Sequence, residues 1–168
     1  METGVILDKV TSGEQTGYDW KMDGNRLIGH KDYGISGYLL SPVIKNINLT
    51  CTVKIEKGNR AAVIFRYDEN TRKGSALILD AKSGDVEIAR TENGQSVMRD
   101  AMTLGIKAGK DYTVRIFARS EFADCYVNDR FIFSTVVDDT PLSGKIAFAV
   151  DSGMASFYDL RIASLESE

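Results

Sequence analysis

Apolar and polar residues alternate along most of this chain with a period of two, the pattern of strands that have one buried and one exposed face. In 49–55, for example, apolar residues at the odd positions alternate with Thr50, Thr52 and Lys54. The predicted strands cover residues 4–10, 18–29, 36–42, 47–57, 61–68, 75–81, 85–91, 111–118, 122–128, 130–136, 145–151 and 155–163. So many short strands predict an all-β sandwich or barrel.

Turn-forming residues separate these strands at short intervals, as in Asp23-Gly24-Asn25 and Asp151-Ser152-Gly153. No stretch of ten or more residues keeps a helical stripe, although 97–104 has the composition for one or two turns of helix. We find no internal repeat and no linker. The sequence therefore predicts one domain over residues 1–168.

The chain of 168 residues is 43% hydrophobic and 27% charged, which is typical of a globular protein. A net charge of −3 gives no electrostatic reason to expect nucleic acid as a partner. No apolar run approaches the roughly 18 residues of a membrane span, so no membrane partner is expected. The N-terminus does not have the pattern of a signal peptide. Either the protein is cytosolic, or it is a domain taken from a longer exported chain.

The two cysteines fall on the apolar faces of predicted strands. Cys51 alternates with threonines, and Cys125 shares its face with Ala123 and Val127. Both are interpreted as small core residues with free thiols. A disulfide between them would require the two strands to be neighbours.

The residues needed for catalysis or zinc binding are sparse. His30 is the only histidine and lies in a turn, which argues against a serine or cysteine triad. One histidine and two core cysteines do not make a zinc site. The acidic pattern Glu-x-Asp-x-x-Glu of many all-β glycan hydrolases is also missing, because Asp85-Val-Glu87 is followed by Arg90 at the third position. We therefore predict that the protein is not an enzyme.

One strand combines an apolar middle with charged residues at its end. Arg66 and Asp68 are two positions apart, so a regular strand would place them on one face. A guanidinium beside a carboxylate matches the donors and acceptors of neighbouring sugar hydroxyls. The alternative interpretation is an ion pair at the surface.

Several short sequence segments occur in an order that resembles that of a known group of sandwich domains. They lie at residues 20–29, 61–69, 79–88, 124–132, 144–151 and 155–162. From about residue 17 to 163, the chain resembles the concanavalin-like modules of fructan-degrading enzymes. These are the family 66 carbohydrate-binding modules and the related C-terminal sandwich of glycoside hydrolase family 32.

The resemblance implies an antiparallel two-sheet jelly roll of the concanavalin and laminin-G type, which binds sugar without catalysis. It implies that Arg66 and Asp68, with Glu69 next, bind the terminal sugar of a fructan, and that Asp151 matches an aspartate after a late strand. It also implies an exported protein in which the module targets an attached glycoside hydrolase to polysaccharide.

Two departures from the family pattern affect the ligand. Ser75 and Val150 stand where such modules often have aromatic residues, so stacking surface is lost and the sugar or the affinity is expected to differ.

Two other functions remain open. One is a structural sandwich that packs on a catalytic domain and has no ligand, and the other is a small glycan hydrolase or lyase.

Aromatic residues and acidic turns give further expectations. Trp20, Phe65, Phe148 and Phe157 are predicted to be core, whereas the tyrosines to consider for sugar stacking are Tyr18, Tyr33, Tyr38 and Tyr67. No cofactor is expected, except that sandwiches of this group often hold a structural calcium. The turns Asp68-Glu69-Asn70 and Asp138-Asp139 have suitable oxygens, but too few to assign a site.

Overall fold

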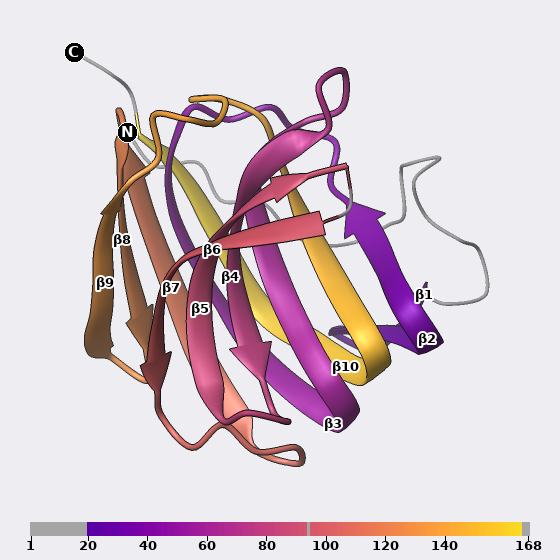
Figure 1. Ribbon diagram of the computed structural model, residues 1–168. Helices are drawn as coiled ribbons and strands as arrows, with labels where there is room; N and C mark the ends of the chain where they lie inside the picture. Colours follow the sequence, from indigo (N-terminus) through magenta and orange to yellow (C-terminus); the bar gives the residue numbers. More distant parts are fainter. Residues whose placement is uncertain (1–19, 94, 166–168) are drawn as a thin grey trace.

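The computed structural model describes residues 20–93 and 95–165, and their regular structure consists of ten β-strands (Figure 1). The strands are β1 (Trp20–Asp23), β2 (Arg26–Leu39), β3 (Asn46–Asp68), β4 (Lys73–Asp80), β5 (Asp85–Glu92), β6 (Gln95–Thr103), β7 (Asp111–Arg119), β8 (Phe122–Val127), β9 (Arg130–Val136) and β10 (Lys145–Leu165). All pairings between them are antiparallel. The described part of the chain contains no helix of the length and hydrophobicity needed to span a membrane.

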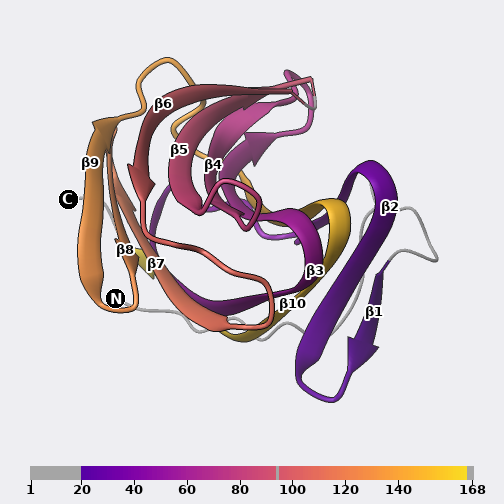
Figure 2. The ribbon, with the colours of Figure 1, turned by 60° about the horizontal axis from the view of Figure 1, so that its bottom comes forward.

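Three long strands, β2, β3 and β10, belong to both layers of a sandwich. Residues 60–68 of β3 pair with β4, which continues to β5 and β6, whereas residues 47–54 of β3 pair with β7, which continues to β8 and β9. β10 lies between β3 and β2 through both layers. Figure 2 shows how β3 and β10 curve from one layer into the other. We call the two layers the β4–β6 layer and the β7–β9 layer.

Close contact between backbones explains the bend of β3 and β10. Gly58 has φ +92°, and a Cβ at this position would lie 2.2 Å from the carbonyl oxygen of Ser152. A Cβ on Gly153 would lie 2.3 Å from the carbonyl oxygen of Lys57. Only glycine fits at such distances, so this pair of glycines lets the two strands touch where they bend.

The hydrophobic core fills the space between the two layers. The predicted core aromatics Trp20, Phe65, Phe148 and Phe157 are all buried. The rings of Phe148 and Phe157 lie 4.8 Å apart, and the indole of Trp20 packs on Phe157 and donates a hydrogen bond to Ser36 Oγ (2.8 Å). Each fully buried aromatic side chain contributes about 2–3 kcal/mol through removal of apolar surface from water.

The all-β jelly-roll sandwich predicted from the sequence is confirmed, with corrections to two segments. Residues 97–104 are not helical, because β6 is an edge strand paired with β5. The predicted strand 18–29 is a hairpin whose two strands, β1 and β2, are joined at Gly24 (φ +62°). The predicted strand 4–10 lies outside the described residues.

Both cysteines are free and buried, as predicted. Cys51 lies on β3 and Cys125 on β8, and each points into the core. Burial raises the pKa of each thiol to about 12. Neither thiol is therefore a nucleophile at neutral pH.

Candidate functional site

A groove with a volume of about 290 Å³ crosses the outer face of the β4–β6 layer, the face turned away from the core. It spans β2, β10, β3 and β4, and it ends at Thr91 of β5 and at Gln95 and Ser96 of β6. Side chains on the other face of these strands, such as Val63, Leu77 and Phe148, belong to the core. Successive side chains of a strand alternate between its two faces, so one face of this layer packs in the core and the outer face is open to a ligand.

Small side chains form the floor of the groove. The strand register places Gly37, Ala149, Ala62 and Ile78 in one row across the sheet. The next row contains Leu39, Ala147, Ile64, Ala76 and Ala89. A floor that rises no higher than a methyl group at most positions lets a flat ligand lie close to the sheet.

A charged pair lies at the end of the groove near the bend. Arg60 donates from Nε (3.1 Å) and Nη2 (2.5 Å) to Oδ2 of Asp151, its partner on β10. Asp80 faces Arg60 from β4, and Glu87 lies on β5. Burial opposes the charge of Arg60, but the bond to Asp151 and the attraction of Asp151, Asp80 and Glu87 raise the pKa of its guanidinium. Arg60 is therefore a permanent cation among three carboxylates.

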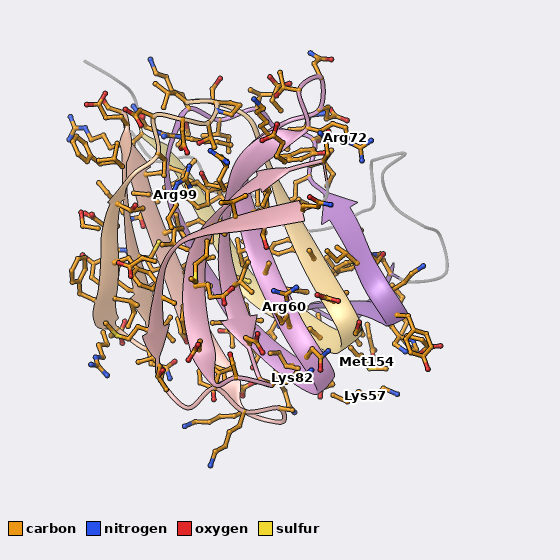
Figure 3. The ribbon with its side chains drawn as sticks, viewed as in Figure 1. Lys57, Arg60, Arg72, Lys82, Arg99 and Met154 are labelled. Carbon is orange, nitrogen blue, oxygen red and sulfur yellow. The ribbon has the colours of Figure 1, made fainter. Side chains whose placement is uncertain are left out.

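Polar residues border the other end of the groove. They are Tyr67 at the end of β3, Arg72 in the β3–β4 turn, Thr91 on β5, and Gln95 and Ser96 on β6. Figure 3 shows Arg60 near the bend of β3 and Arg72 at the opposite end. Within the described residues, the Arg72 side chain makes no hydrogen bond or ion pair, so its donors are available to a ligand. An apolar floor with polar groups at both ends suits a molecule whose rings have apolar faces and hydroxyl edges.

The structure contradicts the predicted exposure of Arg66. Only 1% of its surface is accessible. Its guanidinium donates to the carbonyl oxygens of Lys45 (2.8 Å) and Ser120 (2.6 Å) and to Oδ1 of Asn46 (3.3 Å). Burial lowers the pKa of this group. Arg66 therefore fastens the β2–β3 and β7–β8 connections to each other and does not reach a ligand.

A β-bulge explains why the alternation fails at this point. The register of β3 shifts between Phe65 and Asp68 against β4, and Arg66 has φ +54°. An extra residue in a strand turns the following side chains to the other face. The expectation that Arg66 and Asp68 share one face is therefore wrong.

The other predicted ligand residues are dispersed. Asp68 accepts a hydrogen bond from the amide of Asn70 (2.8 Å), which makes it a turn-forming residue. Glu69 forms an ion pair with Lys145. Asp151 lines the groove, but its partner is Arg60 and not Arg66. The roles of Asp68, Glu69 and Asp151 in binding sugar stay predictions.

The predicted stacking tyrosines also differ in their surroundings. Tyr67 and Tyr38 both belong to the lining of the groove, but the Tyr38 side chain is buried and its ring lies 5.5 Å from that of Trp20. Tyr33 is 86% exposed. Tyr18 lies outside the described residues.

Sequence reasoning missed Arg60 and Arg72 as groove residues, and Glu87 as a carboxylate whose charge acts on Arg60. Arg60 had a signal, because it begins the face that continues with Ala62 and Ile64, opposite the core face of Ala61 and Val63. No local sequence pattern predicts that Arg60 pairs with Asp151, because the two residues are 91 positions apart in the sequence. Register between distant strands is needed to bring them together.

The acidic turns do not fit a calcium ion well. Both oxygens of Asp139 accept hydrogen bonds from guanidinium groups, those of Arg99 and Arg90, and Asp68 is engaged in its turn. Across residues 20–93 and 95–165, no three His, Cys, Asp or Glu side chains are grouped so that they could hold a metal ion. Calcium prefers six to eight oxygen ligands.

Known structures share this architecture. The carbohydrate-binding module CBM66 from Bacillus subtilis superimposes with a TM-score of 0.80 and 24% identity, over 86% of this chain and 91% of that one. The chain has the fold of CBM66. A Bacillus licheniformis β-glucanase matches with a TM-score of 0.68 and 13% identity, over 98% of this chain and 92% of that one.

A third solved structure also matches. The exoplasmic/lumenal domain of VIP36, in a Ca²⁺/Man-bound form, has a TM-score of 0.70 and 9% identity, over 89% of this chain and 82% of that one. No model of a known protein family matches the sequence, and no curated protein matches it. The concanavalin-like resemblance expected from the sequence is confirmed at the level of the fold.

Proposed function

We propose that this protein is a carbohydrate-binding module that binds polysaccharide in the groove of the β4–β6 layer. The observation that carries the proposal is the Arg60–Asp151 pair beside a floor of small apolar side chains. Sugar rings have C–H faces that pack on apolar surface and hydroxyl groups that both donate and accept. The groove offers both kinds of contact in one place.

The charged end suits vicinal hydroxyl groups. Arg60 has donors beyond those used by Asp151, and Glu87 has no hydrogen-bond partner among the described residues. A hydroxyl group can donate to a carboxylate and accept from a guanidinium at the same time. Hydrogen bonds to charged groups contribute about 1.5–3 kcal/mol each, so a few of them give measurable affinity for a short glycan.

We propose a fructan, levan or inulin, as the polysaccharide, and its terminal sugar as the part held at the Arg60–Asp151 end. Two considerations support this choice: the sequence resembles fructan-binding modules, and the fold is shared with CBM66. We further propose that the domain acts outside the cell, joined to a glycoside hydrolase, and that it does no chemistry itself.

Affinity electrophoresis against levan, inulin and lichenan tests the proposal directly. Ala62 lies on the groove floor and is partly exposed, so Ala62→Leu fills the groove with little effect on the core. Wild type is expected to be retarded by levan or inulin, and Ala62→Leu is expected to migrate freely. Equal migration of both proteins in every polysaccharide would contradict the proposal.

A second candidate function is a structural domain that packs on a catalytic domain. Exposed apolar side chains on β8 and β9 favour it, since Phe122 lies beside Val136 at one end of this pair of strands and Phe131 lies at the other end. These side chains lie on the β7–β9 layer, away from the groove. A domain with this function alone would bind none of the three polysaccharides.

A further inference from the structure

β2 bends at the same level as β3 and β10, beside the Arg60–Asp151 pair. Ile35 pairs with Asp151 and Lys31 pairs with Gly153, so three residues of β2 face the single residue Ser152. The extra residues project from the sheet, and Tyr33 at their centre is 86% exposed. Ile35 is 52% exposed and lines the groove. Ile35 therefore lies in water beside the charged pair, and the exposed side chain of Tyr33 is two residues away along the same bend.

A chain of hydrogen bonds joins this bend to the charged pair. The amide of Gly34 donates to Ser152 Oγ (3.2 Å), and the Ser152 hydroxyl donates to Oδ1 of Asp151 (3.0 Å). The other carboxylate oxygen of Asp151 accepts from Arg60. The position of the β2 bend is thus tied to the same carboxylate that orients Arg60.

Ser152 adopts an uncommon backbone conformation to make these bonds. Its φ is +51°, in the left-handed region where non-glycine residues cost about 1 kcal/mol. Its carbonyl oxygen is the group that excludes a side chain from Gly58. Glycine would satisfy this backbone better than serine, so the hydroxyl is what serine adds at this position.

We infer that Tyr33 and Ile35 form an apolar wall at the Arg60–Asp151 end of the groove, which packs on the C–H face of the bound sugar ring. Ser152 is the positioning residue that holds this wall in place relative to Asp151. The inference rests on the proposed function, because it assigns further residues to the same site. It also supplies stacking surface, which Ser75 and Val150 do not provide.

Titration calorimetry with levan oligosaccharides tests the role of Tyr33. Loss of an aromatic contact is expected to weaken binding about five- to tenfold in Tyr33→Ala. Tyr33→Phe keeps the ring and should bind within about twofold of wild type if stacking carries the contact. Phe122→Ala, which removes an exposed aromatic ring from β8, away from the groove, is the control and should bind like wild type.

Two variants at Ser152 separate positioning from stability. Ser152→Gly removes the hydroxyl and relieves the backbone, so its Tm should equal or exceed that of wild type while levan binding weakens about threefold. Ser152→Asn retains a polar side chain that tolerates left-handed φ and should recover part of the affinity. A purely structural role would lower Tm and leave affinity unchanged in Ser152→Gly, which would overturn the positioning role.

The outcomes distinguish this inference from the proposed function. If Arg60→Ala loses levan binding and Tyr33→Ala does not, the groove binds sugar and the apolar wall is wrong. If wild type binds no levan oligosaccharide, both the fructan proposal and the wall are wrong. Protection of Tyr33 from nitration when levan is added, with Tyr126 as the unprotected control, would support the wall independently.

Discussion

Arg60 and Arg66 lie on the same strand, but their environments give them different roles. Arg60 is half-buried in the groove and pairs with a carboxylate, whereas Arg66 is enclosed and bonded to carbonyl and amide oxygens. A buried guanidinium is costly unless its donors form hydrogen bonds, as those of Arg66 do. Arg66 therefore stabilises the fold, whereas Arg60 is available to bind the proposed sugar ligand.

Arg66→Ala is predicted to destabilise the protein by about 2–4 kcal/mol, because it removes three hydrogen bonds that a buried guanidinium donates to the carbonyl oxygens of Lys45 and Ser120 and to the side chain of Asn46. Urea unfolding measures this difference. Arg60→Ala is the control and should cost about 1 kcal/mol or less, since its ion pair is partly solvated. Equal stability of the two variants would contradict the assignment.

The thiols of Cys51 and Cys125 are predicted to be inert in the native protein. Burial and a pKa of about 12 leave almost no thiolate at pH 8. An aromatic disulfide reagent should label neither thiol until urea is added, and reductant should leave Tm unchanged. Rapid labelling of the folded protein would show that these strands open locally.

Among the elements, the edge strand β6 is fastened by a cluster of charged residues. Arg99 of β6 forms an ion pair with Asp139 and donates to Ser75 Oγ (3.1 Å), while Arg90 of β5 donates to Asp139 (3.2 Å). Thr140 shares a hydrogen bond with Ser75 (3.2 Å). The loop before β10 is thereby joined to the edge of the β4–β6 layer.

Acid is predicted to weaken this cluster. Burial opposes the ionised form, but the bonds and attraction to Arg99 and Arg90 lower the pKa of Asp139 below its ordinary value of 3.8. The unfolded state therefore binds the proton more readily, so the contribution of Asp139 is present above about pH 4 and is lost as pH falls further. Asp139→Asn should be less stable than wild type at pH 7, and the difference should shrink at pH 3. An equal difference at both pH values would contradict this role.

The bend between the layers is predicted to depend on Gly58. In Gly58→Ala the new Cβ would overlap Ser152 in a left-handed conformation, which should destabilise the protein by about 2 kcal/mol or more. Gly109→Ala is a matched control, since Gly109 has φ +84° but no atom within 4 Å of a new Cβ. Both variants place a side chain at a left-handed φ, so the difference between their melting temperatures measures the destabilisation that is due to overlap with Ser152 alone. Similar losses in both would mean that the bend tolerates a side chain.

At the scale of the whole molecule, the fold was predictable because each strand carries its own alternation. The core aromatics Phe65, Phe148 and Phe157 followed from this pattern. The candidate site was less predictable, since a single bulge at Arg66 reverses which face a side chain occupies. The pairing of Arg60 with Asp151 depends on the register of two distant strands, which no local pattern contains.

The isolated protein is predicted to release no reducing sugar from levan, inulin or lichenan. The carboxylate of Asp151 at the charged end of the groove accepts two hydrogen bonds from Arg60, so it is not free to act as a general acid toward a sugar. A reducing-sugar assay over pH 4–8 checks this expectation. Activity that disappears in Glu87→Gln or Asp80→Asn would instead establish a glycan hydrolase.

The central claim is that sugar binds beside Arg60 and Asp151, and titration calorimetry of Arg60→Ala with levan oligosaccharides tests it most directly. The variant should bind about 10–100-fold more weakly than wild type, because charge-assisted hydrogen bonds are lost. Its melting curve should stay close to that of wild type, and Phe122→Ala should bind normally. Unchanged affinity in Arg60→Ala, with wild type binding levan, would place the sugar elsewhere on the molecule.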